Sequence, residues 1–109
     1  MDSPDGDSPG LARPTRQQRK IERRLFEVHA RLAKARAALE VIDEQLAALE
    51  ELAEDAHLRM LVSETSDAGR TWREADGHAR RLAEHRGAQL AEIARLEAAQ
   101  DDLFSQLVF

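Results

Sequence analysis

The sequence predicts an all-α fold, a two-helix antiparallel coiled-coil hairpin with a disordered N-terminal tail. Three observations favour it: a long apolar heptad repeat, a composition typical of long helices, and one cluster of turn-forming residues between two periodic segments. Charged residues make up 34% of the 109 residues and aromatic residues only 4%, which fits long helices better than a compact mixed fold. A hairpin of this size is one domain without a deep interior for a substrate.

The apolar repeat predicts the first helix. Apolar residues follow one another at strictly alternating spacings of four and three, as in a helix that packs lengthwise against another helix. Thr15 and Gln18 form a candidate capping box at its start. We therefore expect a helix over 16–62, about 70 Å long at 1.5 Å per residue. The repeat consists of Ile21, Leu25, Val28, Leu32, Ala35, Leu39, Ile42, Leu46, Leu49, Ala53, Ala56 and Met60.

The remaining segments complete the hairpin, which is expected to span 15–109. Residues 1–14 are rich in Asp, Pro and Gly, a composition that predicts a disordered acidic tail. Ser, Thr, Asp and Gly gather over 63–70, which predicts the loop. Thr71 and Glu74 form a second candidate capping box, so the second helix is expected over 71–107.

The apolar repeat of the second helix is less regular than that of the first. Arg86 and Gln89 fall on seam positions unless the repeat slips to Leu90. Such a slip is a stutter that locally unwinds a coiled coil, and Gly87 lies inside it and weakens the helix. We therefore expect a bend near Gly87.

The charges are unevenly distributed along the chain. Seven acidic residues and no basic residue lie between Glu40 and Asp55, whereas residues 70–86 carry five Arg. Folding the chain back is expected to place these two segments side by side and so to favour the antiparallel register. The alternative is that both are merely solvated faces.

A basic arm is the strongest local charge feature. Six bases lie within twelve residues and are opposed by one acid, Glu22. We expect the arm to project beyond the paired region and to bind an acidic protein surface or a phosphate backbone. Interleaved aromatic residues for base stacking are absent from it, and an ordinary solvated helix start is the alternative. The arm consists of Arg13, Arg16, Arg19, Lys20, Arg23 and Arg24.

An apolar terminus is expected at the same end of the hairpin, with more large apolar side chains than a two-helix seam can cover. Self-association into a dimer of hairpins is the favoured interpretation. A foreign protein partner, packing within the hairpin end and a protease-recognised terminus are the alternatives. Val41, Leu52, Leu58 and Leu61 lie off the seam and favour a second buried stripe. The apolar terminus consists of Phe26, Leu103, Phe104, Leu107, Val108 and Phe109.

The expected hairpin tip is acidic, with Glu64 and Asp67 in the tetrapeptide Glu-Thr-Ser-Asp. A long antiparallel hairpin with acids at its tip resembles the coiled-coil domain of bacterial transcript-cleavage factors of the Gre type. The resemblance covers only the shape and this tetrapeptide, and it implies a tip that enters RNA polymerase. The globular domain that anchors those factors has no counterpart here.

The sequence carries no comparable signal for catalysis or for a cofactor. There is no Cys, so disulfides and thiolate metal sites are excluded. Glu54 and His57 have the spacing of one Glu-x-x-His pair, but a di-iron bundle needs two such pairs and two further Glu. No metal, cofactor, small-molecule substrate or catalytic residue is therefore expected.

The predicted function is that of a non-enzymatic coiled-coil interaction, scaffold or adaptor protein that self-associates. Residues 1–10 lack the features of a secretory signal, and no membrane span is evident, so cytoplasmic residence is expected. The alternative function is a transcription-associated or nucleic-acid-binding regulator that acts through the basic arm or the acidic tip.

Overall fold

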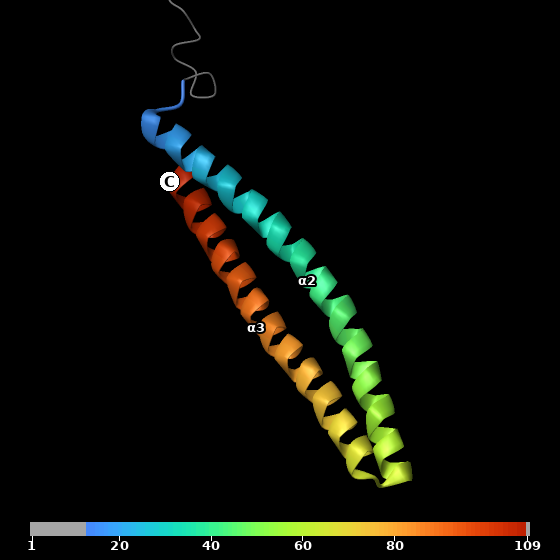
Figure 1. Cartoon of the computed structure of the whole chain (residues 1–109). Helices are drawn as coiled ribbons and strands as arrows, with labels where there is room; N and C mark the ends of the chain where they lie inside the picture. Colours follow the sequence, from blue (N-terminus) through green and yellow to red (C-terminus); the bar gives the residue numbers. More distant parts are fainter. Residues whose placement is uncertain (1–12, 109) are drawn as a thin grey trace, which may run out of the picture.

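The computed structural model describes residues 13–108, which form two long helices folded back on one another (Figure 1). Helix α2 spans Arg16–Ser63 and helix α3 spans Ser66–Val108. The start of α2 and the end of α3 lie together at one end of a rod that is 15 Å across. The predicted all-α antiparallel hairpin is thus confirmed. Most of the predicted tail, residues 1–12, lies outside the described residues.

The start of α2 is the predicted capping box. The backbone N–H of Gln18 donates to Thr15 Oγ1 over 3.0 Å, and the Thr15 N–H donates to Gln18 Oε1 over 2.7 Å. These bonds satisfy backbone groups that a helix start leaves without partners. From there α2 runs unbroken for 48 residues, about 72 Å at 1.5 Å per residue.

The predicted seam of α2 is confirmed position by position. All twelve residues of the heptad repeat are buried or half-buried, and every other residue of α2 except His57 is exposed. The most completely buried is Leu32, at 1% exposure. The contribution of α2 to the core therefore comes from this one stripe of residues.

A central cluster fixes the register of the two helices. Leu32 and Ala35 of α2 pack with Ile93 and Leu96 of α3, and Leu39 packs against this group. The buried seams of both helices continue on either side of this cluster. The seam residues of α2 therefore lie opposite those of α3, as in an antiparallel coiled coil.

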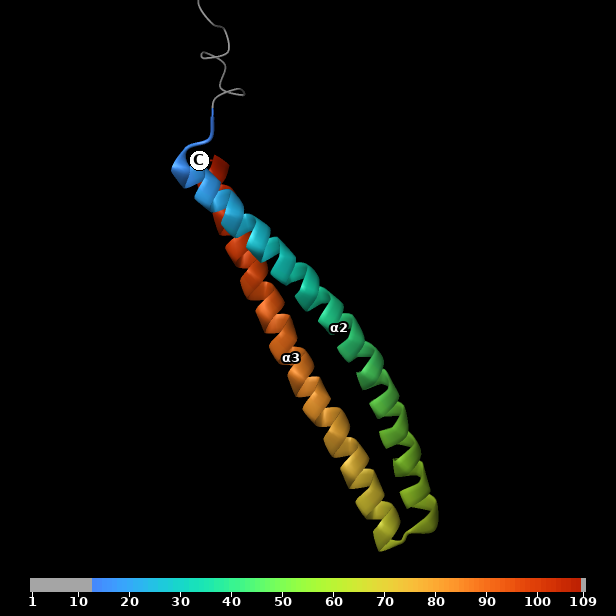
Figure 2. The ribbon, with the colours of Figure 1, turned by 45° about the horizontal axis from the view of Figure 1, so that its top comes forward.

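The seam of α3 differs from the expected stutter. Leu90 is 40% exposed, whereas Arg86 and Gln89 are half-buried on the seam, so the repeat continues without a slip. Gln89 Nε2 donates to the backbone oxygen of Ala35 over 3.1 Å, and Arg86 Nε donates to Asp43 Oδ1 over 2.5 Å. These hydrogen bonds give both polar side chains a partner at their seam positions. The expected bend is not observed, since α3 runs nearly straight while α2 bows (Figures 1 and 2).

The loop is shorter than predicted, and α3 starts earlier. Only Glu64 and Thr65 lie between the helices, so α3 begins at Ser66 instead of residue 71. Thr65 Oγ1 accepts from the Ala68 N–H over 3.1 Å and so caps α3. Thr71, the predicted cap, instead donates its hydroxyl to the Asp67 carbonyl within the helix. Turn-forming residues here make up a first helical turn.

Glu64 ends α2 in a left-handed conformation. Its φ is 52°, and its N–H donates to the Met60 carbonyl over 2.9 Å. Glycine adopts this conformation without the steric cost that a side chain adds.

We expect Glu64→Gly to raise the free energy of unfolding by about 1 kcal/mol, because it relieves backbone strain. The melting temperature followed by circular dichroism should rise by a few degrees. Glu64→Val is the matched variant and should lower it, since a β-branched residue fits this conformation worst. Equal melting of both variants would contradict the assignment of strain to this residue.

Candidate interaction surfaces

The basic arm is exposed, but it projects less than expected. All six side chains are solvent-exposed, and none forms an ion pair with an acid of the described residues. The two-residue loop lets α3 reach almost to the start of α2, and Ile21 is buried at 5% exposure. Only about one turn of α2 therefore extends past α3. Arg23 and Arg24 lie beside the paired region.

The apolar terminus is divided between the core and the surface. Leu103 is 5% exposed and belongs to the seam of the hairpin itself, and Leu107 is half-buried. Leu103 is therefore not available to a partner, which corrects its assignment to a contact surface. The side chains of Phe26, Phe104 and Val108 are exposed. Phe109 lies outside the described residues.

More apolar side chains are exposed on the second half of α2. This hairpin alone does not cover the stripe that was expected to be buried. Val62, which was not predicted to belong to this stripe, is also exposed. The exposed residues here are Val41, Leu52, Leu58, Leu61 and Val62.

The acidic segment of α2 does not pair with the basic segment of α3 as expected. Arg86 to Asp43 is the one ion pair that joins the two segments within the described part of the chain. The other ion pairs between the described helices join Arg31 to Glu92 at 3.5 Å and Arg36 to Glu97 at 3.0 Å. The reason is helical phase, because most acids over 40–55 occupy positions that point away from α3.

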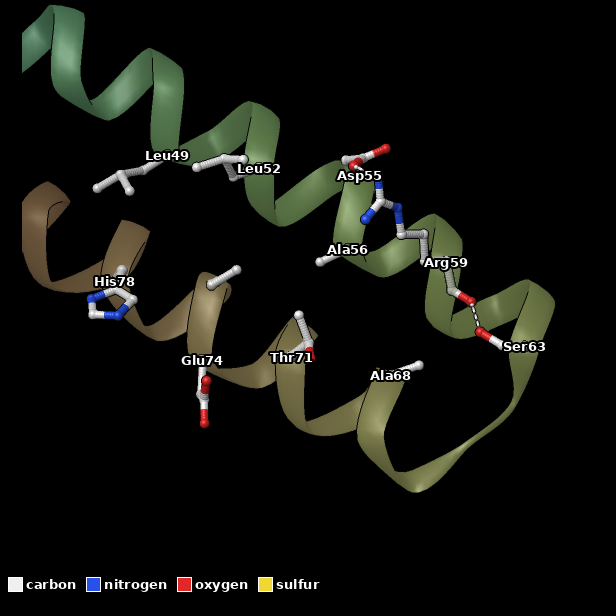
Figure 3. A pocket seen from close by; sticks show the side chains of 11 residues that line it. Leu49, Leu52, Asp55, Ala56, Arg59, Ser63, Ala68, Thr71, Glu74 and His78 are labelled. Atoms are coloured by element: carbon white, nitrogen blue, oxygen red, sulfur yellow. Dashed lines mark hydrogen bonds and ion pairs between the residues drawn. The ribbon is translucent and has the colours of Figure 1, made fainter.

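A shallow groove lies between the helices near the loop, with a volume of about 500 Å³. Figure 3 shows Ala56 and Thr71 facing the space between α2 and α3, with Glu74 directed away from it. Small side chains in the neighbouring seam, including Ala53 and Ala79, are the sequence signal that predicts an open flank here. Its wall residues are Leu49, Leu52, Asp55, Ala56, Arg59, Ser63, Ala68, Thr71, Glu74, Ala75 and His78.

His57 packs against an aromatic side chain. Its ring stacks on Trp72 with ring centroids 4.7 Å apart and an interplanar angle of 27°. Stacked pairs of this kind contribute to packing beyond their buried area. Between residues 13 and 108, no group of three or more His, Asp or Glu side chains is placed to hold a metal ion.

The two acidic tip residues lie where α2 ends and α3 begins. Glu64 is the C-cap of α2 in the two-residue loop, and Asp67 lies in the first turn of α3, where a negative charge is favourable. Asp67 Oδ1 lies 3.7 Å from Arg70 Nη1, an i,i+3 ion pair. The Asp67 carboxylate thus has a structural role in the hairpin, whereas Glu64 contributes its backbone as the cap of α2.

The exposed arm, the exposed apolar groups and the outward acids are thus the candidate interaction surfaces of the rod, whose described part has no deep cavity. Neither described helix has an apolar stretch long enough to cross a bilayer. Comparisons with protein-family models, curated proteins and solved structures give no match to this chain.

Proposed function

We propose that this protein is a non-enzymatic coiled-coil interaction or scaffold protein that self-associates through the outer surface of its hairpin. The observation that carries this proposal is the 77% exposure of Phe26, within the regular part of α2. Burying a large apolar side chain contributes about 1.5 to 3 kcal/mol. A second copy would cover such groups and extend the two-helix rod into a bundle.

The charge distribution also supports contact with another chain. The basic arm has no acidic partner within the described residues, and most acids over 40–55 point away from α3. One copy can therefore offer a second copy both signs of charge. The other candidate, a nucleic-acid-binding or transcription-associated regulator, has less support because Asp67 at the tip pairs with Arg70 and the arm lacks aromatic residues.

We expect the intact chain to be a dimer at micromolar concentration and Phe26→Glu to weaken the dimer at least about tenfold, since it places a charge in an apolar contact. Sedimentation equilibrium measures both. Glu84→Gln, an exposed change on α3, is the control and should leave the dimer intact. A monomeric intact chain would contradict self-association.

A further inference from the structure

The outer face of α2 carries a second heptad seam that nothing within the hairpin covers. Its members alternate in spacing by three and four, and all are exposed. In order they are three Arg, one Phe, three Ala, two Glu, one Ala, two Glu and two Leu. The outer seam consists of Arg16, Arg19, Arg23, Phe26, Ala30, Ala33, Ala37, Glu40, Glu44, Ala47, Glu51, Glu54, Leu58 and Leu61.

Like charges are stacked along both halves of this face. Arg19 and Arg23 are four residues apart, as are Glu40 and Glu44, and like-charged neighbours at this spacing destabilise a helix. None of these four side chains forms an ion pair within residues 13–108. A basic surface beside the acids and an acidic surface beside the bases would relieve both repulsions.

We propose that a second copy of this chain docks antiparallel along the outer seam, with α2 against α2 and a two-fold axis between residues 31 and 32. This inference specifies the surface of the self-association proposed above and rests on it. An antiparallel arrangement places the basic half of each α2 on the acidic half of the other, and the contact repeats itself about the axis as a two-fold interface requires.

The register follows from the residues of the seam. Ala30 of each copy lies opposite Ala33 of the other at the axis, where small side chains let the two backbones approach closely. Phe26 then lies against Ala37. Farther out, Arg23 faces Glu40 and Arg19 faces Glu44, which gives four Arg–Glu pairs per dimer.

Neighbouring registers fit less well. Sliding one copy by seven residues in one direction also keeps four Arg–Glu pairs per dimer, through Arg19 with Glu51 and Arg16 with Glu54. That register, however, sets the apolar Phe26 against Glu44 and Ala30 against Glu40. Sliding it by seven in the other direction leaves only one Arg–Glu pair in each half, Arg16 with Glu40. The proposed register is the one that joins an apolar centre to complementary charged flanks.

A charge-swap experiment tests this register. Arg19→Glu/Arg23→Glu turns the four pairs into Glu–Glu contacts, and Glu40→Arg/Glu44→Arg turns them into Arg–Arg contacts. Each double variant alone should dissociate at least about 100-fold more readily than the intact chain. An equimolar mixture should form a heterodimer, because every pair is again Glu with Arg. Sedimentation equilibrium gives the masses, and circular dichroism verifies that each variant remains helical.

The control is Arg73→Glu/Arg81→Glu, two exposed sites on α3, which should dimerise as the intact chain does. Added salt should weaken the intact dimer, since the flanking pairs are exposed to screening. Dimers of the separate variants as tight as the intact one, or no heterodimer in the mixture, would overturn the register. If Phe104→Glu then disrupted the dimer, self-association would run through the end of the rod, whereas a monomeric intact chain would reject self-association itself.

Discussion

Leu32→Ala is expected to lower the free energy of unfolding by about 2 to 5 kcal/mol, the range for removing a buried Leu side chain. Leu32 is the most buried residue of the described chain, at 1% exposure, and it packs in the central cluster with Ile93 and Leu96. Domains of ordinary size are stable by only about 5 to 15 kcal/mol. The variant should therefore lose a large part of its helical signal at temperatures where the intact chain is folded.

Leu58→Ala is the matched control, because the same atoms are removed from the same helix at a side chain that is 56% exposed. It should change the free energy of unfolding by no more than about 0.5 kcal/mol. Urea unfolding followed by circular dichroism measures both variants, at equal protein concentration because association adds to apparent stability. Equal losses in the two variants would show that the buried face of α2 is assigned wrongly.

The seam of α2 could be predicted from the sequence because an amphipathic helix in a two-helix rod has one buried stripe and nothing else to bury. Under that condition periodicity alone identifies the core, from Ile21 to Met60. The capping box at Thr15 was equally predictable, since its bonds join residues three apart and need no tertiary context. These features are local or strictly periodic.

The loop could not be predicted from composition, because the same residue types start helices and make turns. Ser66, Asp67 and Gly69 are turn formers, yet in the structure they follow the cap at Thr65 as the first turn of α3. The five-residue earlier start also shifts the pairing of the helices. The basic arm therefore extends less far beyond α3 than expected.

The candidate surfaces were found only in part, because counting charges along the chain ignores helical phase. Residues 40–55 were correctly identified as acidic, but Glu40 and Glu44 point away from α3 and thus cannot reach its Arg residues. The members of the outer seam share one face of α2, opposite the predicted buried seam, a relation that a count of charges along the chain does not use. Leu103 lies seven residues after Leu96 on the uninterrupted seam of α3, so the periodicity of that helix places it in the core and not on a contact surface.

The polar seam residues of α3 give the second large expected effect. Arg86→Leu/Gln89→Leu should raise the free energy of unfolding by about 1 kcal/mol. Two Leu side chains on the seam would contribute about 1.5 to 3 kcal/mol each if fully buried, but these positions are only half-buried. The hydrogen bonds to Asp43 and Ala35 that are lost are exposed or half-buried, so each contributes near the lower end of the usual range of about 0.5 to 1.5 kcal/mol. The melting temperature should rise by about 4 to 8 °C, the shift for about 1 kcal/mol in a domain near this size.

Arg95→Leu/Gln106→Leu makes the same chemical change at two exposed positions of α3 and should leave the melting temperature nearly unchanged. A large rise in this control would show that added hydrophobicity or helix propensity, and not burial on the seam, stabilises the helix. A fall in the seam variant would mean that the two polar residues hold the helices in register more strongly than Leu can by packing. That outcome is physically reasonable, because one polar residue on a coiled-coil seam can fix register at a cost in stability. Calorimetry at one protein concentration separates these outcomes, since a mixture of registers would broaden the unfolding transition whereas uniform stabilisation would only shift it.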